Sequence, residues 1–214
     1  MTVSGDFAGG GAATAPDVRR RLLAAAVELF ARKGYAATRV QEIVAACGVT
    51  KPVLYYYFGS KEGLFLAVMQ ETLALFESTI AGALSGAGSV RERIGRLLDG
   101  VFALILDNLE VARLAHALYF GPSQDAPVFD LEIFHQRLQD VVRALVAEGQ
   151  ARGELRRGEP EIVAMALLGA LDIAEGIALC HPDWGFGREQ LRRVLDVIFE
   201  GAQVSAQIVT EEVS

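Results

Sequence analysis

The sequence predicts an all-α protein with a small three-helix domain near the N-terminus and a larger helical domain after it. Hydrophobic residues make up 52% of the 214-residue chain, which is enough to bury a sizeable core. Ala, Leu, Arg and Glu are abundant and favour helices, whereas the strict apolar and polar alternation that is typical of strands is hard to find. We therefore expect a flexible tail over residues 1–16, a first domain over 17–64 and a second domain over 65–214.

The first helix is expected from Asp17, an acidic residue suited to a first turn, to Gly34, which stops it. Its apolar residues follow helical spacing: Leu22, Ala26, Leu29 and Phe30.

Two short helices follow the first one. We expect Thr38 to cap the second helix and Gly48 to end it, with an apolar stripe of Val40, Ile43, Val44 and Cys47. Thr50 is expected to cap the third helix, which carries Pro52 in its first turn, where a missing N–H costs little. Both helices are therefore short, and a glycine separates them.

Longer helices are expected in the rest of the chain. A fourth helix begins near Ser60 and runs toward Leu84, before a Gly- and Ser-rich break over residues 85–89. The later helical patterns cover residues 90–108, 110–120, 129–150, 160–180 and 188–210, and the first two of these could also be one bent helix.

Charge is distributed unevenly along the chain, whose net charge is −7. Residues 17–65 carry eight basic and four acidic side chains, although the remainder of the protein is acidic. A short positive segment in an acidic chain is typical of a single DNA-binding module.

Cysteine, histidine and acidic residues show no pattern of a disulfide framework, a metal site or a catalytic set. Cys47 and Cys180 lie far apart in sequence, and we find no N-terminal signal peptide, so we expect a reducing cytoplasm. The Cys180-His181 pair has no second ligand cluster at suitable spacing. We therefore predict no metal, no cofactor and no enzymatic activity, while an all-α enzyme with a hidden site and a protein-interaction module remain the alternatives.

The stretch from Ile162 to Leu179 is about long enough to span a bilayer. Asp172 and Glu175 interrupt it, which favours a buried helix of a soluble protein over a membrane span.

The second and third helices meet the physical requirements of a helix-turn-helix. Gly48 can adopt a positive φ at low cost, and Val49 can fill the angle between the helices. Leu54 and Phe58, one turn apart, are expected to point inward and hold the third helix in place. Its N-terminal turns would then enter the major groove of DNA.

Thr38 to Ile43 (TRVQEI), Gly48 to Phe58 (GVTKPVLYYYF) and Lys61 resemble the DNA-binding domain of the TetR family over about residues 18–66. The resemblance implies base contacts by Gln41, Lys51, Pro52, Val53 and Tyr55. It implies phosphate contacts by Thr38, Arg39, Tyr56, Tyr57 and Lys61. Thr50, at the start of the third helix, completes the expected DNA-binding set. Tyr57 stands where many family members have His, which puts one phosphate contact in doubt.

The resemblance also implies a homodimer formed by the last two long helices and a ligand pocket in the larger domain. The penultimate helix supports the dimer independently, because it is apolar almost all round. The expected pocket residues place isolated polar groups among apolar ones: Phe102, Leu106, His116, Tyr119, Phe120, Phe134, Met165 and Asp172. Each of them could instead be an ordinary core residue.

Together these features predict a regulator that leaves a palindromic operator when a small apolar or amphipathic molecule binds. Activation instead of repression remains open.

Overall fold

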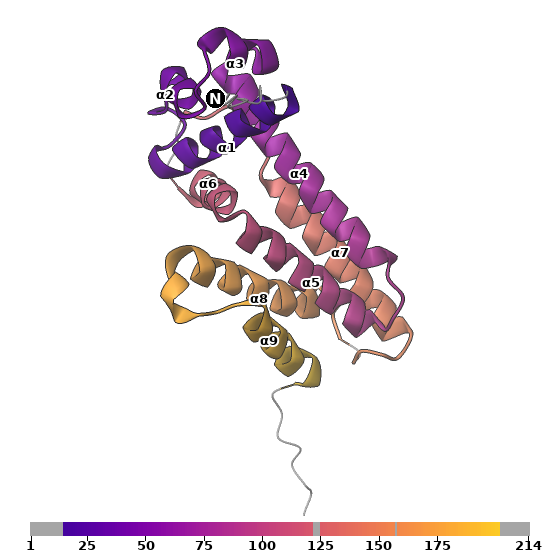
Figure 1. Ribbon diagram of the computed structural model, residues 1–214. Coiled ribbons are helices and arrows are strands. Elements are labelled where there is room, and N and C mark those ends of the chain that lie inside the picture. The colour runs from indigo at the N-terminus through magenta and orange to yellow at the C-terminus, as the bar shows by residue number, and fades with distance from the viewer. Residues whose placement is uncertain (1–14, 122–124, 157, 202–214) are drawn as a thin grey trace, which may run out of the picture. The chain divides into compact units, whose positions relative to one another are not determined.

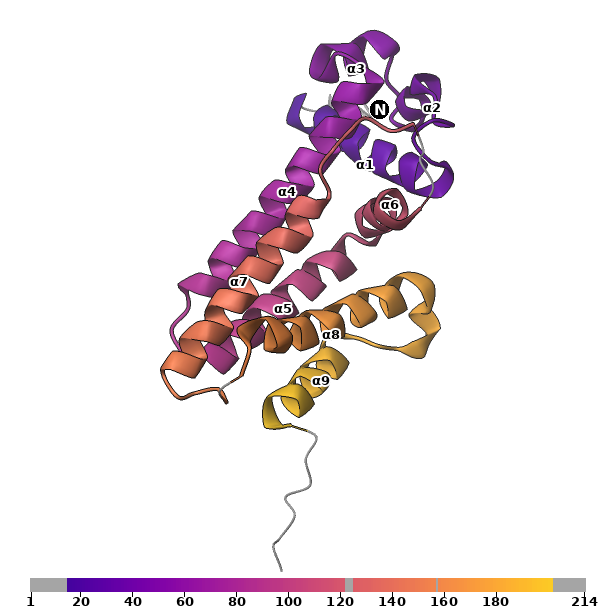
Figure 2. The same ribbon diagram turned by 180° about the vertical axis from the view of Figure 1, so that it is seen from behind.

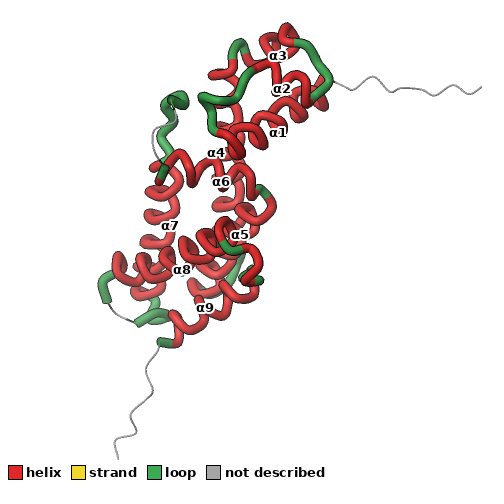
Figure 3. Tube along the Cα trace, turned by 90° about the vertical axis from the view of Figure 1, so that its left-hand side faces the viewer, coloured by secondary structure: helices red, strands yellow, loops and turns green. Residues whose placement is uncertain are grey.

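The computed structural model describes residues 15–121, 125–156 and 158–201, and every regular element within them is helical (Figures 1 and 3). This confirms the all-α prediction. In chain order the α-helices are α1 (Ala15–Lys33), α2 (Val40–Ala46), α3 (Lys51–Phe58), α4 (Lys61–Ser85), α5 (Val90–Asp107), α6 (Leu109–Phe120), α7 (Glu132–Ala151), α8 (Pro160–Cys180) and α9 (Arg188–Glu200). A single 3₁₀ turn, η1 (Pro182–Trp184), lies between α8 and α9.

The chain forms two compact units, and the division falls within α4. The first unit contains the chain up to Thr72 together with Arg113–Phe129, and the second contains Leu73–Ala112 and the chain from Asp130. The predicted domain boundary at residues 64 and 65 also lies in α4. The return of residues 113–129 to the first unit has no local signal in the sequence.

The first unit is built on a core shared by its short helices. Leu22 of α1, Ile43 of α2, Leu54 of α3 and Leu64 of α4 are fully buried. Phe65 closes this core by an edge-on contact with Phe30, whose ring centroid lies 5.9 Å away. Each short helix therefore depends on its neighbours for its apolar contacts, because an isolated helix of seven or eight residues is marginal in water.

The second unit buries a larger core between α5, α7, α8 and α9. Figure 2 shows these helices from behind. Leu97 of α5, Val142 of α7 and Leu167 of α8 are fully buried in it. Phe76 in the second half of α4 packs edge-on against Phe134 of α7, with ring centroids 5.2 Å apart. These contacts join helices that are distant in sequence into one hydrophobic cluster.

Ion pairs fix α9 against α5 at the edge of this core. Asp99 of α5 accepts hydrogen bonds from Arg188, at 2.5 Å, and from Arg192, at 2.9 Å. Closer to the other end of α9, Arg91 donates to Asp196 and Glu200 at 2.8 and 3.2 Å. The Asp99 side chain is only 14% exposed, so this pair is better shielded from water than a typical surface ion pair.

Several helix ends differ from those expected. Arg39, not Thr38, is the N-cap residue of α2. Residues 90–120 form two helices that break at Asn108, whose side-chain amide donates to the Leu104 carbonyl oxygen at 2.9 Å. The helix expected from Phe129 begins at Glu132, whose N–H donates to the Asp130 carboxylate.

Two expected segments lie at the chain ends. The expected tail lies largely outside the described residues, as does the part of the last helix beyond Gly201.

Two helices, α4 and α8, are long and apolar enough to cross a membrane when judged by length and composition alone. This is weak evidence, because core helices of soluble proteins pass the same test.

Candidate nucleic-acid interface

The turn between α2 and α3 has the backbone conformation that a helix-turn-helix requires. Gly48 adopts φ +64°, a left-handed conformation that a side chain would strain. The Val49 N–H donates back to the Val44 carbonyl oxygen at 3.0 Å, which closes the end of α2. The chain therefore reverses tightly, and α3 packs against α2.

The N-terminal turn of α3 is exposed, while its inward side is buried. Leu54 is fully buried, and Thr50, Lys51 and Pro52 all face solvent. Thr50 is the N-cap residue, as expected, although its side chain makes no capping hydrogen bond. The first turn of α3 is therefore accessible to a molecule as large as DNA.

The three consecutive tyrosines differ in exposure. Tyr55 is 46% exposed and Tyr56 is 83% exposed, whereas Tyr57 is half-buried. The Tyr56 and Tyr57 rings meet edge-on with centroids 5.1 Å apart, and Tyr57 also lies against Phe58. Tyr55 and Tyr56 are therefore accessible to another molecule. Val53, which lies nearer the N-terminus of α3, is half-buried.

Two expected phosphate-binding residues have internal partners. The Thr38 side chain is 1% exposed, and its hydroxyl donates to the Gly34 carbonyl oxygen at 2.8 Å, with the Leu29 carbonyl oxygen 3.3 Å away. The Lys61 ammonium donates to two main-chain carbonyl oxygens and lies over the ring of Tyr35. The Thr38 side chain therefore faces the interior of the first unit, and its phosphate contact stays a prediction.

The exposed residues at the start of α2 complete the candidate surface. Arg39 and Gln41 both face solvent. The Arg39 N–H donates to the Glu42 carboxylate at 2.8 Å, and Lys33 donates to the same carboxylate at 2.5 Å. The Lys33 ammonium and the Arg39 N–H hold the pKa of Glu42 below its ordinary value.

Sequence reasoning missed Glu42 and Tyr35, although the three-residue spacing of Arg39 and Glu42 resembles that of a capping box. No local spacing could have indicated the contacts of Tyr35 with Lys61 and Phe65, because both of these residues lie on α4, far from Tyr35 in sequence.

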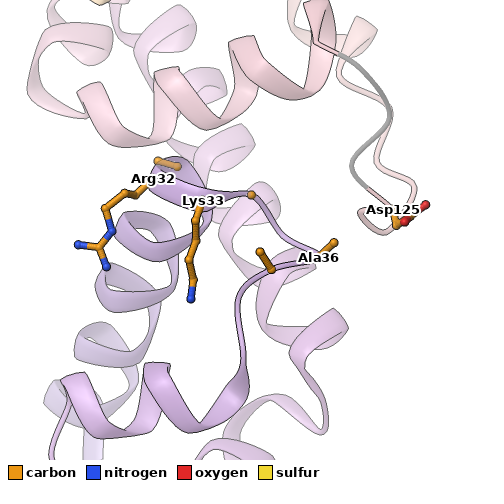
Figure 4. Close-up of a pocket in the computed structure, with 7 residues that line it drawn as sticks. Arg32, Lys33, Ala36 and Asp125 are labelled. Atoms are coloured by element: carbon orange, nitrogen blue, oxygen red, sulfur yellow. The ribbon is translucent and has the colours of Figure 1, made fainter.

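A shallow hollow of about 430 Å³ lies in the first unit beside the end of α1 (Figure 4). Its polar lining comes from Arg32, Lys33 and Asp125, and the rest comes from small residues. None of the residues expected to bind DNA or a small molecule lines it.

The residues expected to bind a small molecule fall in both units. Five of them, Phe102, Leu106, Phe134, Met165 and Asp172, belong to the second unit. His116, Tyr119 and Phe120 belong to the first unit. Phe102 is fully buried, whereas Met165 is 66% exposed, so neither unit by itself assembles the expected set.

An apolar surface on α8 and α9 remains uncovered in the single chain. Ile162, Met165 and Ile173 on α8 are exposed, as are Val194 and Val197 on α9. A Cβ atom added at Gly169 or Gly176 would meet nothing within 4 Å, so the backbone of α8 is open at both points. We call these five apolar residues and two glycines the α8–α9 surface.

Among the residues that the structure describes, no group of three or more His, Cys, Asp or Glu side chains could hold a metal ion. Cys180 is exposed at the end of α8, and Cys47 is buried in the first unit.

A packed three-helix core that presents the start of α3 to solvent defines the class of protein as a helix-turn-helix DNA-binding regulator. Comparison with known proteins supports this class and narrows it. Residues 22–68 match the family model described as bacterial regulatory proteins, tetR family. This part of the chain is therefore similar to the DNA-binding domain of the TetR family of regulators.

Individual relatives extend the similarity beyond the first unit. The transcriptional repressor DhaR from Mycobacterium sp. (strain GP1) is 28% identical over 200 residues, which cover 91% of this chain and 97% of DhaR. The transcriptional activator FasR from Mycolicibacterium smegmatis is 38% identical over 96 residues, which cover 45% of this chain and 44% of FasR. Similarity to DhaR thus spans both units.

A solved structure supports the fold as well. The regulator FadR from Bacillus subtilis, in complex with stearoyl-CoA, has a TM-score of 0.65 at 18% identity, covering 86% of this chain and 99% of FadR. At that identity the likeness is one of fold.

Proposed function

We propose that this regulator acts in the cytoplasm as a homodimer that binds a palindromic operator and leaves it when a small apolar or amphipathic molecule binds. One observation carries the DNA-binding part of the proposal. The start of α3 presents Lys51, Pro52 and Tyr55 to solvent, while Leu54 anchors the same helix in the core. A rigid helix with a free N-terminal turn suits insertion into a major groove.

Side-chain chemistry divides this surface into two roles. Gln41, Lys51 and Tyr55 can reach base edges with polar groups, and Pro52 and Val53 offer apolar contact to thymine methyl groups. Arg39, Tyr56 and Tyr57 carry donors that suit phosphate oxygens, which position a protein on DNA without reading its sequence.

The α8–α9 surface supports the homodimer. Exposed apolar side chains on two neighbouring helices would be buried by the same surface of a second copy, which is the arrangement of a two-fold symmetric interface. The open backbone at Gly169 and Gly176 would let the partner helix approach closely. Such a dimer would place two α3 helices about 34 to 36 Å apart, or a multiple of that distance, on a palindromic site.

The second unit is the proposed place of ligand binding, through the expected residues that belong to it: Phe102, Leu106, Phe134, Met165 and Asp172. The mostly apolar character of Phe102, Leu106 and Phe134 suits a hydrophobic or amphipathic molecule. FadR, which has the same fold, binds stearoyl-CoA, a molecule with a long acyl chain. Ligand binding would release DNA by shifting α4, which belongs to both units, with a coupling of about 1 to 3 kcal/mol.

Activation is the second candidate, because FasR, which is 38% identical to this chain over 96 residues, is an activator. Transcription in vitro from the bound promoter distinguishes the two: a repressor lowers transcript yield and an activator raises it.

Selection of duplexes from a random DNA pool tests the proposal when the operator sequence is unknown. The wild-type protein should enrich a palindromic sequence, and Lys51→Met should bind that sequence more weakly. Arg96→Met, which removes one positive charge from an exposed site on α5, serves as the control and should bind as the wild type does. Failure of the wild-type protein to enrich any sequence would contradict the proposed function.

A further inference from the structure

Lys61, the first residue of α4, contacts the turn between α1 and α2. Its ammonium donates to the carbonyl oxygens of Tyr35 at 2.9 Å and Thr38 at 3.0 Å. The same Nζ atom lies 4.0 Å from the centroid of the Tyr35 ring. Two of its three N–H groups are therefore bonded to this turn, and the charge is stabilised by the aromatic face.

The surroundings of Lys61 favour this internal position. The Tyr35 ring packs against Phe30 and Phe65, with centroids 5.4 and 5.3 Å away, so the ring beneath the ammonium is fixed by the core. Lys61 itself is half-buried. Burial lowers the pKa of the Lys61 ammonium, as expected for a cation partly removed from water.

The peptide bond between Thr38 and Arg39 is held from both of its polar ends. Its carbonyl oxygen accepts the hydrogen bond from Lys61, and its N–H donates to the Glu42 carboxylate at 2.8 Å. Lys33 at the end of α1 fixes that carboxylate in turn. Because Arg39 is the N-cap residue of α2, this peptide determines where the first turn of α2 begins.

We propose that Lys61 is a positioning residue, which ties the start of α4 to the Thr38–Arg39 peptide and so sets how Arg39 and Gln41 are presented to DNA. This role replaces the phosphate contact that family resemblance implied for Lys61, and it rests on the proposed DNA-binding function. Any displacement of the first turn of α4 would pull on the Thr38 carbonyl oxygen, so Lys61 links α4 to the orientation of α2.

Salt dependence separates a positioning role from a phosphate contact. Each phosphate contact contributes about −0.9 to the slope of log affinity against log salt concentration. Lys61→Met should weaken operator binding about tenfold, the effect of roughly 1.4 kcal/mol, while leaving this slope unchanged. Arg39→Met, the matched control at an exposed cation for which a phosphate contact is proposed, should make the slope shallower by about 0.9. A shallower slope for Lys61→Met would overturn the proposal.

Glu42→Ala provides a variant that leaves Lys61 intact and releases the other end of the same peptide. Removing a negative charge beside DNA should raise affinity if only electrostatics matters. Positioning instead requires weaker operator binding. Because Lys61 sets how Gln41 is presented, the losses from Lys61→Met and Gln41→Ala should also be less than additive in the double variant. Tighter binding by Glu42→Ala, or fully additive losses, would contradict the positioning role.

Amide hydrogen exchange in the free, full-length protein tests the same contact without DNA. Lys61→Met should accelerate exchange over residues 34–42, and Lys51→Met should leave it unchanged. Unchanged exchange in Lys61→Met would refute the proposal even if the protein binds its operator. If the wild-type protein showed no sequence-specific DNA binding, the proposed function itself would be refuted.

Discussion

Glu175 on α8 should make the protein less stable as the pH rises toward neutrality. Burial, and then the nearby charge of Asp172, raise the pKa of Glu175 from 4.5 to about 7. Between these two pH values the folded state binds more protons than the unfolded state, so the free energy of unfolding falls as pH increases. A difference of about 2.5 pH units corresponds to about 3 kcal/mol at full ionisation.

The variant Glu175→Gln removes the ionisation and keeps the shape of the side chain. We expect it to be more stable than the wild type by up to about 3 kcal/mol at pH 8, with the difference shrinking toward zero near pH 4.5. Urea unfolding at several pH values and one protein concentration measures this difference, since a dimer's stability depends on concentration.

The control for this experiment is Glu189→Gln, at an exposed position on α9. Its difference from the wild type should be small at every pH. If the free energy of unfolding of Glu175→Gln changed as little with pH, relative to the wild type, as that of the control, the claim that burial raises the pKa of Glu175 would be refuted. A Glu175→Gln protein less stable than the wild type at pH 8 would refute it as well.

Three further predictions concern the second unit. Leu97→Ala should lower the free energy of unfolding by about 2 to 5 kcal/mol in urea, because Leu97 is fully buried, and a loss typical of a surface site would count against this core. Met165→Arg on the α8–α9 surface should produce monomers in sedimentation velocity, where a retained dimer would exclude α8 from the interface. Burial opposes the ionisation of Asp99, but Arg188 and Arg192 hold its pKa below the ordinary value. Asp99→Asn should therefore cost about 1 kcal/mol at pH 7, and the difference from wild type should vanish as pH falls well below 3.8, which urea unfolding at low pH would check.

Local signals in the sequence predicted most of the helices and the helix-turn-helix. Gly34 and Gly48 end the first two helices as expected, and both adopt positive φ. The start of α8 at Pro160 also agrees, since proline is favoured in a first helical turn. These features depend on residues within a few positions of each other, so one sequence is enough to reveal them.

The roles of Thr38 and Lys61 could not be obtained in this way. The resemblance to the TetR family implied phosphate contacts for both residues, which flank α2 and α3 in the sequence. Their hydrogen bonds instead reach main-chain atoms brought near by folding, with Lys61 and Tyr35 separated by 26 residues in sequence. The sequence gives the identity of a threonine or a lysine, but it does not show whether the polar group faces solvent or a carbonyl oxygen.

The sequence by itself determined the all-α fold class, the order of the helices and the position of the helix-turn-helix. Helical periodicity and the glycines that end helices act over a few residues, so they can be recognised in one sequence. Only the tertiary structure decided which polar residues are exposed, that residues 113–129 join the first unit, and that α8 leaves part of its apolar surface open. Burial depends on which distant segments meet, and that is settled by packing of the whole chain.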